Sequence, residues 1–111
     1  MKCLSYYCDT PATQQLMERY GPHLERLAIE DCLAIAAGIT IAVHWMNVCP
    51  AAEPELLAAC TSEIDYSFND AELAEIIQQL DSELDSGWLA MQLVSGLASI
   101  VSMRMSGPVA A

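Results

Sequence analysis

The side chains of this chain that could carry chemistry are two histidines, five cysteines and fifteen acids. The segment Asp81–Gly87 places acids at alternate positions, as a calcium loop does, but its sixth position is Ser86 and its twelfth is Gln92. A calcium loop needs glycine at the sixth position and a bidentate glutamate at the twelfth. The spacing therefore favours a helix over a calcium site here.

Metal, nucleophile and cofactor patterns give no better candidate. A zinc site would have to use Cys3, Cys8 and His23, whose spacing matches no familiar zinc pattern. His44 lies beside Trp45 and Met46, so we expect a hydrogen-bonded core histidine rather than a ligand or base. The sequence has no His-Glu-x-x-His segment, no glycine-rich phosphate loop and no Gly-x-Ser-x-Gly turn. We therefore expect no metal, no cofactor and no enzymatic activity.

The acids are unevenly compensated along the chain. No lysine or arginine occurs between Leu27 and Met103, although twelve carboxylates do. They are Glu30, Asp31, Glu53, Glu55, Glu63, Asp65, Asp70, Glu72, Glu75, Asp81, Glu83 and Asp85. The formal net charge of −11 disfavours direct contact with nucleic acid and with anionic membranes. It favours a basic partner protein and fast association with it at low salt.

Length and composition bound the architecture. With 111 residues, 54% of them apolar, the chain predicts a single acidic helical domain over 1–111 with a sizeable core. Five cysteines without a Cys-x-x-Cys pair, and no apolar leader, predict free thiols and a cytoplasmic location. The uncharged runs Cys32–Val43 and Trp88–Met103 fall short of the roughly twenty residues of a membrane span. We expect buried core helices there and no membrane partner.

Proline and glycine divide the chain into helices. Thr10-Pro11 predicts a helix start, and Gly21-Pro22 predicts the end of that helix near Tyr20 and the opening of the next. This second helix, about 22–47, is apolar on every side from Cys32 onward and should lie in the middle of the domain.

Three further helices follow by the same signals. A short one is expected from Glu53–Glu55 to about Thr61, one capped by Asn69 to Leu84, and one capped by Ser86 over about 88–105. The segment Cys3–Tyr7 could be a strand, but it has no visible partner. The expected fold is all-α: a compact bundle of four to five helices, with the central apolar helix (about 22–47) packed on the C-terminal helix (about 88–105).

Small residues predict where those two helices meet. Glycine in a helix costs about 1 kcal/mol relative to alanine, so Gly38 and Gly96 predict a close crossing of the two helices. The C-terminal helix also has an uncharged strip of serines, for which two interpretations are open. We favour a groove packed on the central helix; the alternative is a seam for self-association, as in a homodimer. The residues of that seam are Met91, Ser95, Ser99, Ser102 and Met103.

These features favour a protein-binding function. The leading hypothesis is an inhibitor whose acidic surface docks on a basic, nucleic-acid-handling protein or complex. In size and charge the chain is similar to small phage-encoded antagonists of bacterial defence, including anti-CRISPR and DNA-mimic proteins. The alternatives are a toxin-immunity protein, a small acidic secretion or assembly chaperone, and a plain homo-oligomer whose acidity confers solubility. The expected partner-binding residues are Glu53, Glu55, Glu63, Asp65, Asp70, Glu72, Glu75, Asp81, Glu83 and Asp85.

Overall fold

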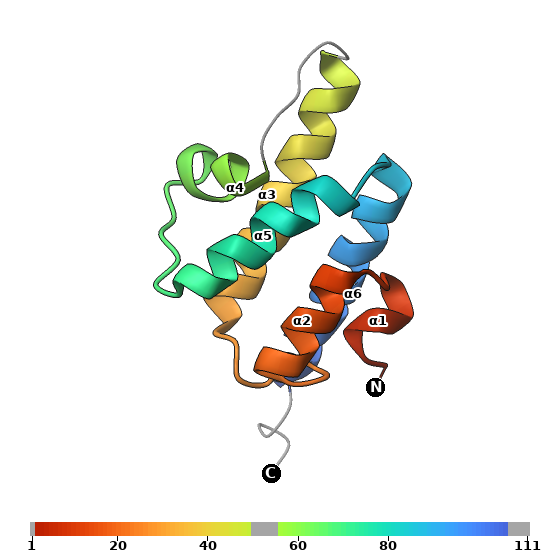
Figure 1. The fold of residues 1–111 in the computed structure, drawn as a ribbon, viewed down its shortest axis with the longest axis vertical. Coiled ribbons are helices and arrows are strands. Elements are labelled where there is room, and N and C mark those ends of the chain that lie inside the picture. The colour runs from red at the N-terminus through yellow and green to blue at the C-terminus, as the bar shows by residue number, and fades with distance from the viewer. Residues whose placement is uncertain (1, 50–55, 107–111) are drawn as a thin grey trace.

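The structure of the protein is a computed structural model that describes residues 2–49 and 56–106. In chain order its elements are α1 (Leu4–Tyr7), α2 (Pro11–Tyr20), α3 (Ile29–Val48), α4 (Leu56–Ala58), the π-helical η1 (Ala59–Glu63), α5 (Ala71–Glu83) and α6 (Gly87–Ser106). The described residues contain no strand, so the all-α prediction is confirmed (Figure 1). Residues 3–7, for which a strand was considered, instead contain the short α1.

Helices α3 and α6 form an antiparallel central pair. They make the most extensive contact between two described elements, which confirms the predicted packing of the central helix on the C-terminal helix. Leu33 near the start of α3 lines a groove with Met105 near the end of α6, while Val43 lies beside Gly87 at the other end. Helices α2 and α5 pack on each other and lie in front of this pair in Figure 1.

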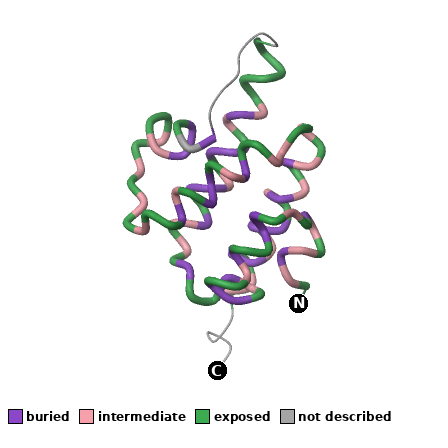
Figure 2. The backbone as a smooth tube through the Cα atoms, viewed as in Figure 1, coloured by how far each residue is buried: buried purple, intermediate pink, exposed green. Residues whose placement is uncertain are grey.

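The core forms where the apolar faces of these helices meet. Helical spacing predicts an apolar face of Leu73, Ile76, Ile77, Leu80 and Leu84 in α5. The first four of these residues are buried, and Leu84, at the C-cap, is partly buried against the core. The buried face belongs to one cluster with fully buried residues of the other elements, among them Leu4, Leu16, Leu24, Ile35, Leu93, Leu97 and Ile100. Figure 2 shows buried and exposed residues alternating along α2 and α5, as expected for helices with one face in the core.

Two helix starts follow the local signals. The hydroxyl of Thr10 accepts a hydrogen bond from the Thr13 backbone N–H at 3.2 Å, and the Thr13 hydroxyl accepts one from the Thr10 N–H at 2.8 Å. Ser86 accepts from the Leu89 N–H at 3.1 Å and caps α6. Gly21 ends α2 with a φ of 101°, a conformation that L side chains rarely adopt.

The predicted start of the central helix at residue 22 is wrong, because α3 begins at Ile29. Residues 21–28 form turns in which Leu24 takes a φ of 52° and buries its side chain. Arg104 of α6 donates hydrogen bonds to the carbonyls of Leu24 at 2.9 Å and Leu27 at 2.5 Å. In place of a continuing helix, α6 thus provides donors to both carbonyls, and the Leu24 carbonyl also accepts from the Leu27 N–H at 3.1 Å.

The predicted cap of α5 is also wrong by one residue. Asp70, not Asn69, is the cap, and its carboxylate accepts from the Glu72 N–H at 3.0 Å. The same carboxylate accepts a hydrogen bond from the hydroxyl of Tyr20 at 2.6 Å. This contact joins α5 to α2 and favours the aspartate over the neighbouring asparagine.

Gly38 and Gly96, which lie inside helices, serve contacts other than the predicted crossing. A Cβ atom at Gly38 would meet the backbone N and Cα of Cys60 in η1 at 2.9 Å. One at Gly96 would meet the side chain of Tyr7 in α1 at 2.9 Å. Helices α3 and α6 do pack together. However, Gly38 allows η1 to approach α3 closely, and Gly96 allows α1 to approach α6 closely.

Helix α3 is less covered than its composition predicts. Its last turns, from His44 to Val48, are exposed, so the expectation of a core His44 is wrong. In Figures 1 and 2 this end of α3 projects beyond the other helices.

Candidate functional site

An acidic groove of about 640 Å³ runs between α2 and α5. Apart from the buried Ile76, its lining residues come from the outward faces of two amphipathic helices whose inward faces belong to the core. They are Gln15, Glu18, Arg19, Glu72, Glu75, Ile76 and Gln79, which we call the acidic groove. The Gln15 side-chain amide donates to the Gln79 amide oxygen at 2.9 Å and so links the two helices.

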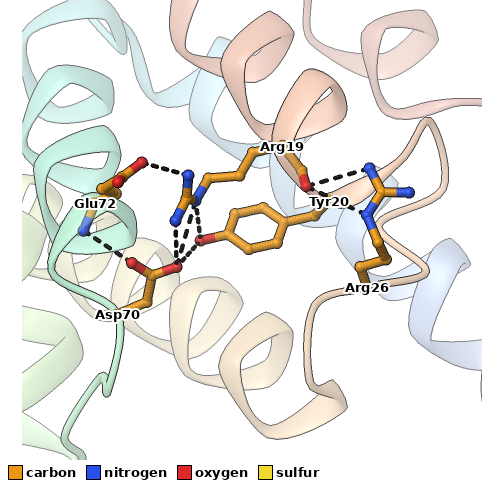
Figure 3. A network of polar contacts seen from close by, with 5 residues as sticks. All are labelled: Arg19, Tyr20, Arg26, Asp70 and Glu72. Carbon is orange, nitrogen blue, oxygen red and sulfur yellow. Dashed lines mark hydrogen bonds and ion pairs between the residues drawn. The ribbon is translucent and has the colours of Figure 1, made fainter.

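Arg19 organises one end of the acidic groove (Figure 3). Its guanidinium forms ion pairs with Glu72 and, at 3.4 Å, with Asp70. The hydrogen bond from the Tyr20 hydroxyl, together with the Glu72 N–H and Arg19, lowers the pKa of Asp70. Burial and the same hydrogen bond to Asp70 raise the pKa of Tyr20 to about 12. Asp70 and Glu72 are thus already neutralised in part from within the chain.

Three of the predicted partner-binding acids accept hydrogen bonds at helix starts. Besides Asp70 at α5, Asp81 accepts from the Leu56 N–H of α4 at 3.1 Å, and Glu83 accepts from the Ala12 N–H of α2 at 3.0 Å. Negative charge at a helix N-terminus is favourable, because unpaired N–H groups and the helix dipole point there. Burial acts to raise the pKa of Glu83, but hydrogen bonds from Gln79, Ala12 and Thr10 outweigh it and lower that pKa.

The other predicted acids differ in position. Glu75 lines the acidic groove, is exposed, and has no ion-pair partner among the described residues. Glu63, Asp65 and Asp85 are exposed outside the groove, and their carboxylates likewise have no hydrogen-bond or ion-pair partner in the described part of the chain. Glu53 and Glu55 lie outside the described residues.

Glu18 was missed by the sequence reasoning. It is exposed in the acidic groove, and no ion pair to it occurs within residues 2–49 and 56–106. It lies in α2, before the stretch free of lysine and arginine on which the prediction concentrated. The sequence did contain a signal. Glu18 lies three residues after Gln15, so both side chains lie on the same face of the helix, and the apolar Leu16 lies on the buried face.

The other lysine and arginine residues do not line the acidic groove. The Lys2 ammonium is 3.9 Å from the centre of the Tyr6 ring, and Arg26 donates to the Arg19 carbonyl at 3.2 Å. Arg104 binds the carbonyls of Leu24 and Leu27. Among the lysine and arginine residues of the described chain, Arg19 is therefore the one with carboxylate ion pairs. Outside the groove, His23 Nδ1 lies 3.4 Å from a carboxylate oxygen of Glu25.

The predicted self-association strip lies mostly outside the buried contact between α3 and α6. Met91, Ser95 and Ser102 are exposed, while Ser99 and Met103 are half-buried. Most of the strip is thus not packed on the central helix, although Ser102 lines a groove beside Leu33 and Ala36 of α3. The buried face of α6 consists instead of Ala90, Leu93, Gly96, Leu97, Ile100 and Val101.

A second, uncharged groove lies between α3 and α6. It has a volume of about 510 Å³ and includes Leu33 and Ala36 of α3 together with Ala98, Ser102 and Met105 of α6. By length and composition alone, α3 and α6 could each cross a membrane, but core helices of soluble proteins pass the same test.

The histidines and cysteines form no metal centre in the described chain. No group of three or more His, Cys, Asp or Glu residues there could hold a metal ion. Burial raises the pKa of Cys32 to about 11 and that of Cys60 to about 12, which keeps both thiols protonated near neutral pH.

Comparison of the chain with models of protein families, with curated proteins and with solved structures found no match in any of the three. Its function is therefore inferred from its own geometry and charge.

Proposed function

We propose that the protein is a non-enzymatic binding protein that docks a basic surface of another protein against the acidic groove. The unequal compensation of charge in that groove carries the proposal. Arg19 is its one basic lining residue and already pairs with Asp70 and Glu72. Glu18 and Glu75 keep uncompensated charges on opposite helices. A lysine or arginine of a partner would supply the missing positive charge.

Chemistry within the groove favours arginine over lysine as the inserted side chain. A guanidinium presents several N–H donors in one plane and can bind a carboxylate with two of them at once. The amides of Gln15 and Gln79 offer further polar contacts beside Glu18 and Glu75. The exposed acids outside the groove would steer a basic partner toward the protein over longer distances at low salt.

Docking on the nucleic-acid channel of a partner would block that channel. This is the manner of action of the phage-encoded anti-defence proteins that the chain resembles in size and charge. A toxin-immunity protein would use the same electrostatic contact. The assembly-chaperone alternative is favoured by a different feature, the exposed uncharged groove between α3 and α6.

The test is capture of proteins from bacterial lysate by the immobilised chain at low and at high salt. The informative variant is Glu18→Gln with Glu75→Gln, because neither carboxylate has an ion pair within the described chain. Glu72 and Glu83 are poor choices, since one pairs with Arg19 and the other holds the start of α2. Asp9→Asn with Glu30→Gln is the matched control, because it removes the same charge outside the groove.

We expect a basic partner that is released at high salt and is captured more weakly by the groove variant. Exposed ion pairs contribute about 0.2–1 kcal/mol each, so losing two should weaken binding roughly 2- to 30-fold. The control variant should capture the partner nearly as well as the wild type. Equal capture by both variants would contradict docking in the groove, and a partner retained at high salt would favour the chaperone alternative.

A further inference from the structure

The exposed residues of α6 recur at intervals of three and four. Apart from the last residue, Ser106, they are Trp88, Met91, Ser95, Ala98, Ser102 and Met105, which we call the α6 stripe. Five of the exposed residues of α3 have the same spacing, and we call them the α3 stripe: Leu33, Ala37, Thr40, His44 and Asn47. Beside the stripe, Glu30 is exposed at the start of α3, and Trp45, Met46 and Val48 are exposed in its last turns. This spacing is that of the seam along which helices pack in coiled coils. Both stripes reach the uncharged groove, to which Leu33 contributes from one side and Ala98, Ser102 and Met105 from the other.

From this arrangement we propose that the face formed by the two stripes is the interface between two copies of this chain. The inference does not depend on the acidic groove, which lies between other helices. An antiparallel α3–α6 pair is half of a four-helix bundle, and a second pair would complete it.

Charge argues for a second copy as the occupant. Glu30, at the start of α3, is the one charged residue among the exposed positions of these two fully described helices. Arg104 is turned toward the carbonyls of Leu24 and Leu27. Two chains of net charge −11 repel each other wherever their carboxylates meet. Contact through the two stripes keeps most of those carboxylates apart, whereas a charged partner would find no complementary charge there.

The size of the face is sufficient for a weak to moderate dimer. Each helix has 20 residues and is therefore about 30 Å long. With helices about 10 Å apart, the pair would cover about 600 Å² on each copy. The total of about 1,200 Å² is at the lower end of stable interfaces. The face also has large, exposed apolar side chains that a dimer would bury: Trp88 is 72% exposed, Met105 62% and Leu33 49%.

A lipid bilayer fits the same face less well. The stripes include Thr40, His44, Asn47, Ser95 and Ser102, whose polar groups would find no water in hydrocarbon. Thr40 and Asn47 donate to backbone carbonyls of their own helix, which leaves their oxygens as outward acceptors. In a protein interface such groups can be paired or remain wet at the rim.

The test is the mass of the full chain by sedimentation equilibrium at about 5 and about 100 µM, a range that spans a low-micromolar dissociation constant. We expect a mass approaching twice 12.1 kDa at the higher concentration. The variant Ala98→Glu adds a carboxylate to the centre of the face and should raise the dissociation constant roughly a hundredfold or more. Gln78→Glu adds the same charge at an exposed position of α5 and should remain dimeric.

Circular dichroism at the two concentrations separates loss of the dimer from loss of the fold in Ala98→Glu. If that variant unfolds, Ser102→Glu at the groove rim replaces it. A wild-type chain that stays at 12.1 kDa at both concentrations would overturn the proposal. So would a monomer that sediments with uncharged phosphatidylcholine vesicles, because the face would then be a membrane contact.

Discussion

Asp70, Asp81 and Glu83 each accept a hydrogen bond from a backbone N–H in the first turn of a helix. Two of these bonds join residues far apart in sequence, since Asp81 binds Leu56 and Glu83 binds Ala12. Part of the acidity of the chain therefore stabilises helix starts. The charges left for a partner are fewer than composition suggests, and within the acidic groove they are Glu18 and Glu75.

Tyr20 and Tyr66 should ionise later than an ordinary tyrosine. Burial and the hydrogen bond to Asp70 raise the pKa of Tyr20 to about 12, and a hydrogen bond to Asp31 does the same for Tyr66. Tyrosine in an unfolded chain has a pKa of about 10. Because the folded pKa values are the higher ones, these groups stabilise the fold below about pH 10. That contribution is lost as the pH rises through about 12.

Ultraviolet absorbance of tyrosinate measures this ionisation directly. We expect a late step in the wild-type titration that is absent from the double variant Tyr20→Phe with Tyr66→Phe. The double variant should also show a smaller loss of thermal stability between neutral and alkaline pH. Wild-type and variant titrations that differ only in amplitude would contradict the predicted shifts.

At the scale of elements, helix starts with local caps were predictable and those set by distant contacts were not. Thr10 and Ser86 cap from adjacent sequence, as predicted. The late start of α3 depends on Arg104, and the cap at Asp70 depends on Tyr20. The covered side of α3 or α6 could not be predicted either, because a helix that is apolar all round has no polar face to orient it. For the same reason the sequence did not indicate that Ser95 and Ser102 of the serine strip are exposed.

Gly38 should be one of the least replaceable residues of the helical framework. A Cβ atom there would meet backbone atoms of Cys60 at 2.9 Å, so Gly38→Ala should destabilise the fold by about 1–3 kcal/mol through overpacking. Gly87→Ala is the matched control, because its Cβ would lie at an ordinary 3.8 Å from Val43. That variant should stay within about 0.5 kcal/mol of the wild type or exceed it. Urea unfolding at one protein concentration measures both, and equal stability would contradict the close approach of η1 to α3.

At the scale of the whole molecule, charge and exposed apolar surface are separated. The acidic groove lies between α2 and α5, and the two uncharged stripes lie on α3 and α6. A dimer joined through the stripes would leave both acidic grooves free. Two grooves on one particle would bind a repetitive or dimeric basic partner more tightly than either groove alone.

The most direct test of docking in the acidic groove is a titration of the isotopically labelled protein with an oligo-arginine peptide, followed by amide chemical shifts. We predict that the shifts concentrate in residues 15–19 and 72–79, and that they fall sharply at about 300 mM salt, where exposed charges are strongly screened. Shifts spread evenly over every segment that bears a carboxylate would contradict specific binding in the acidic groove. Shifts confined to α3 and α6 would contradict the separation of the two surfaces.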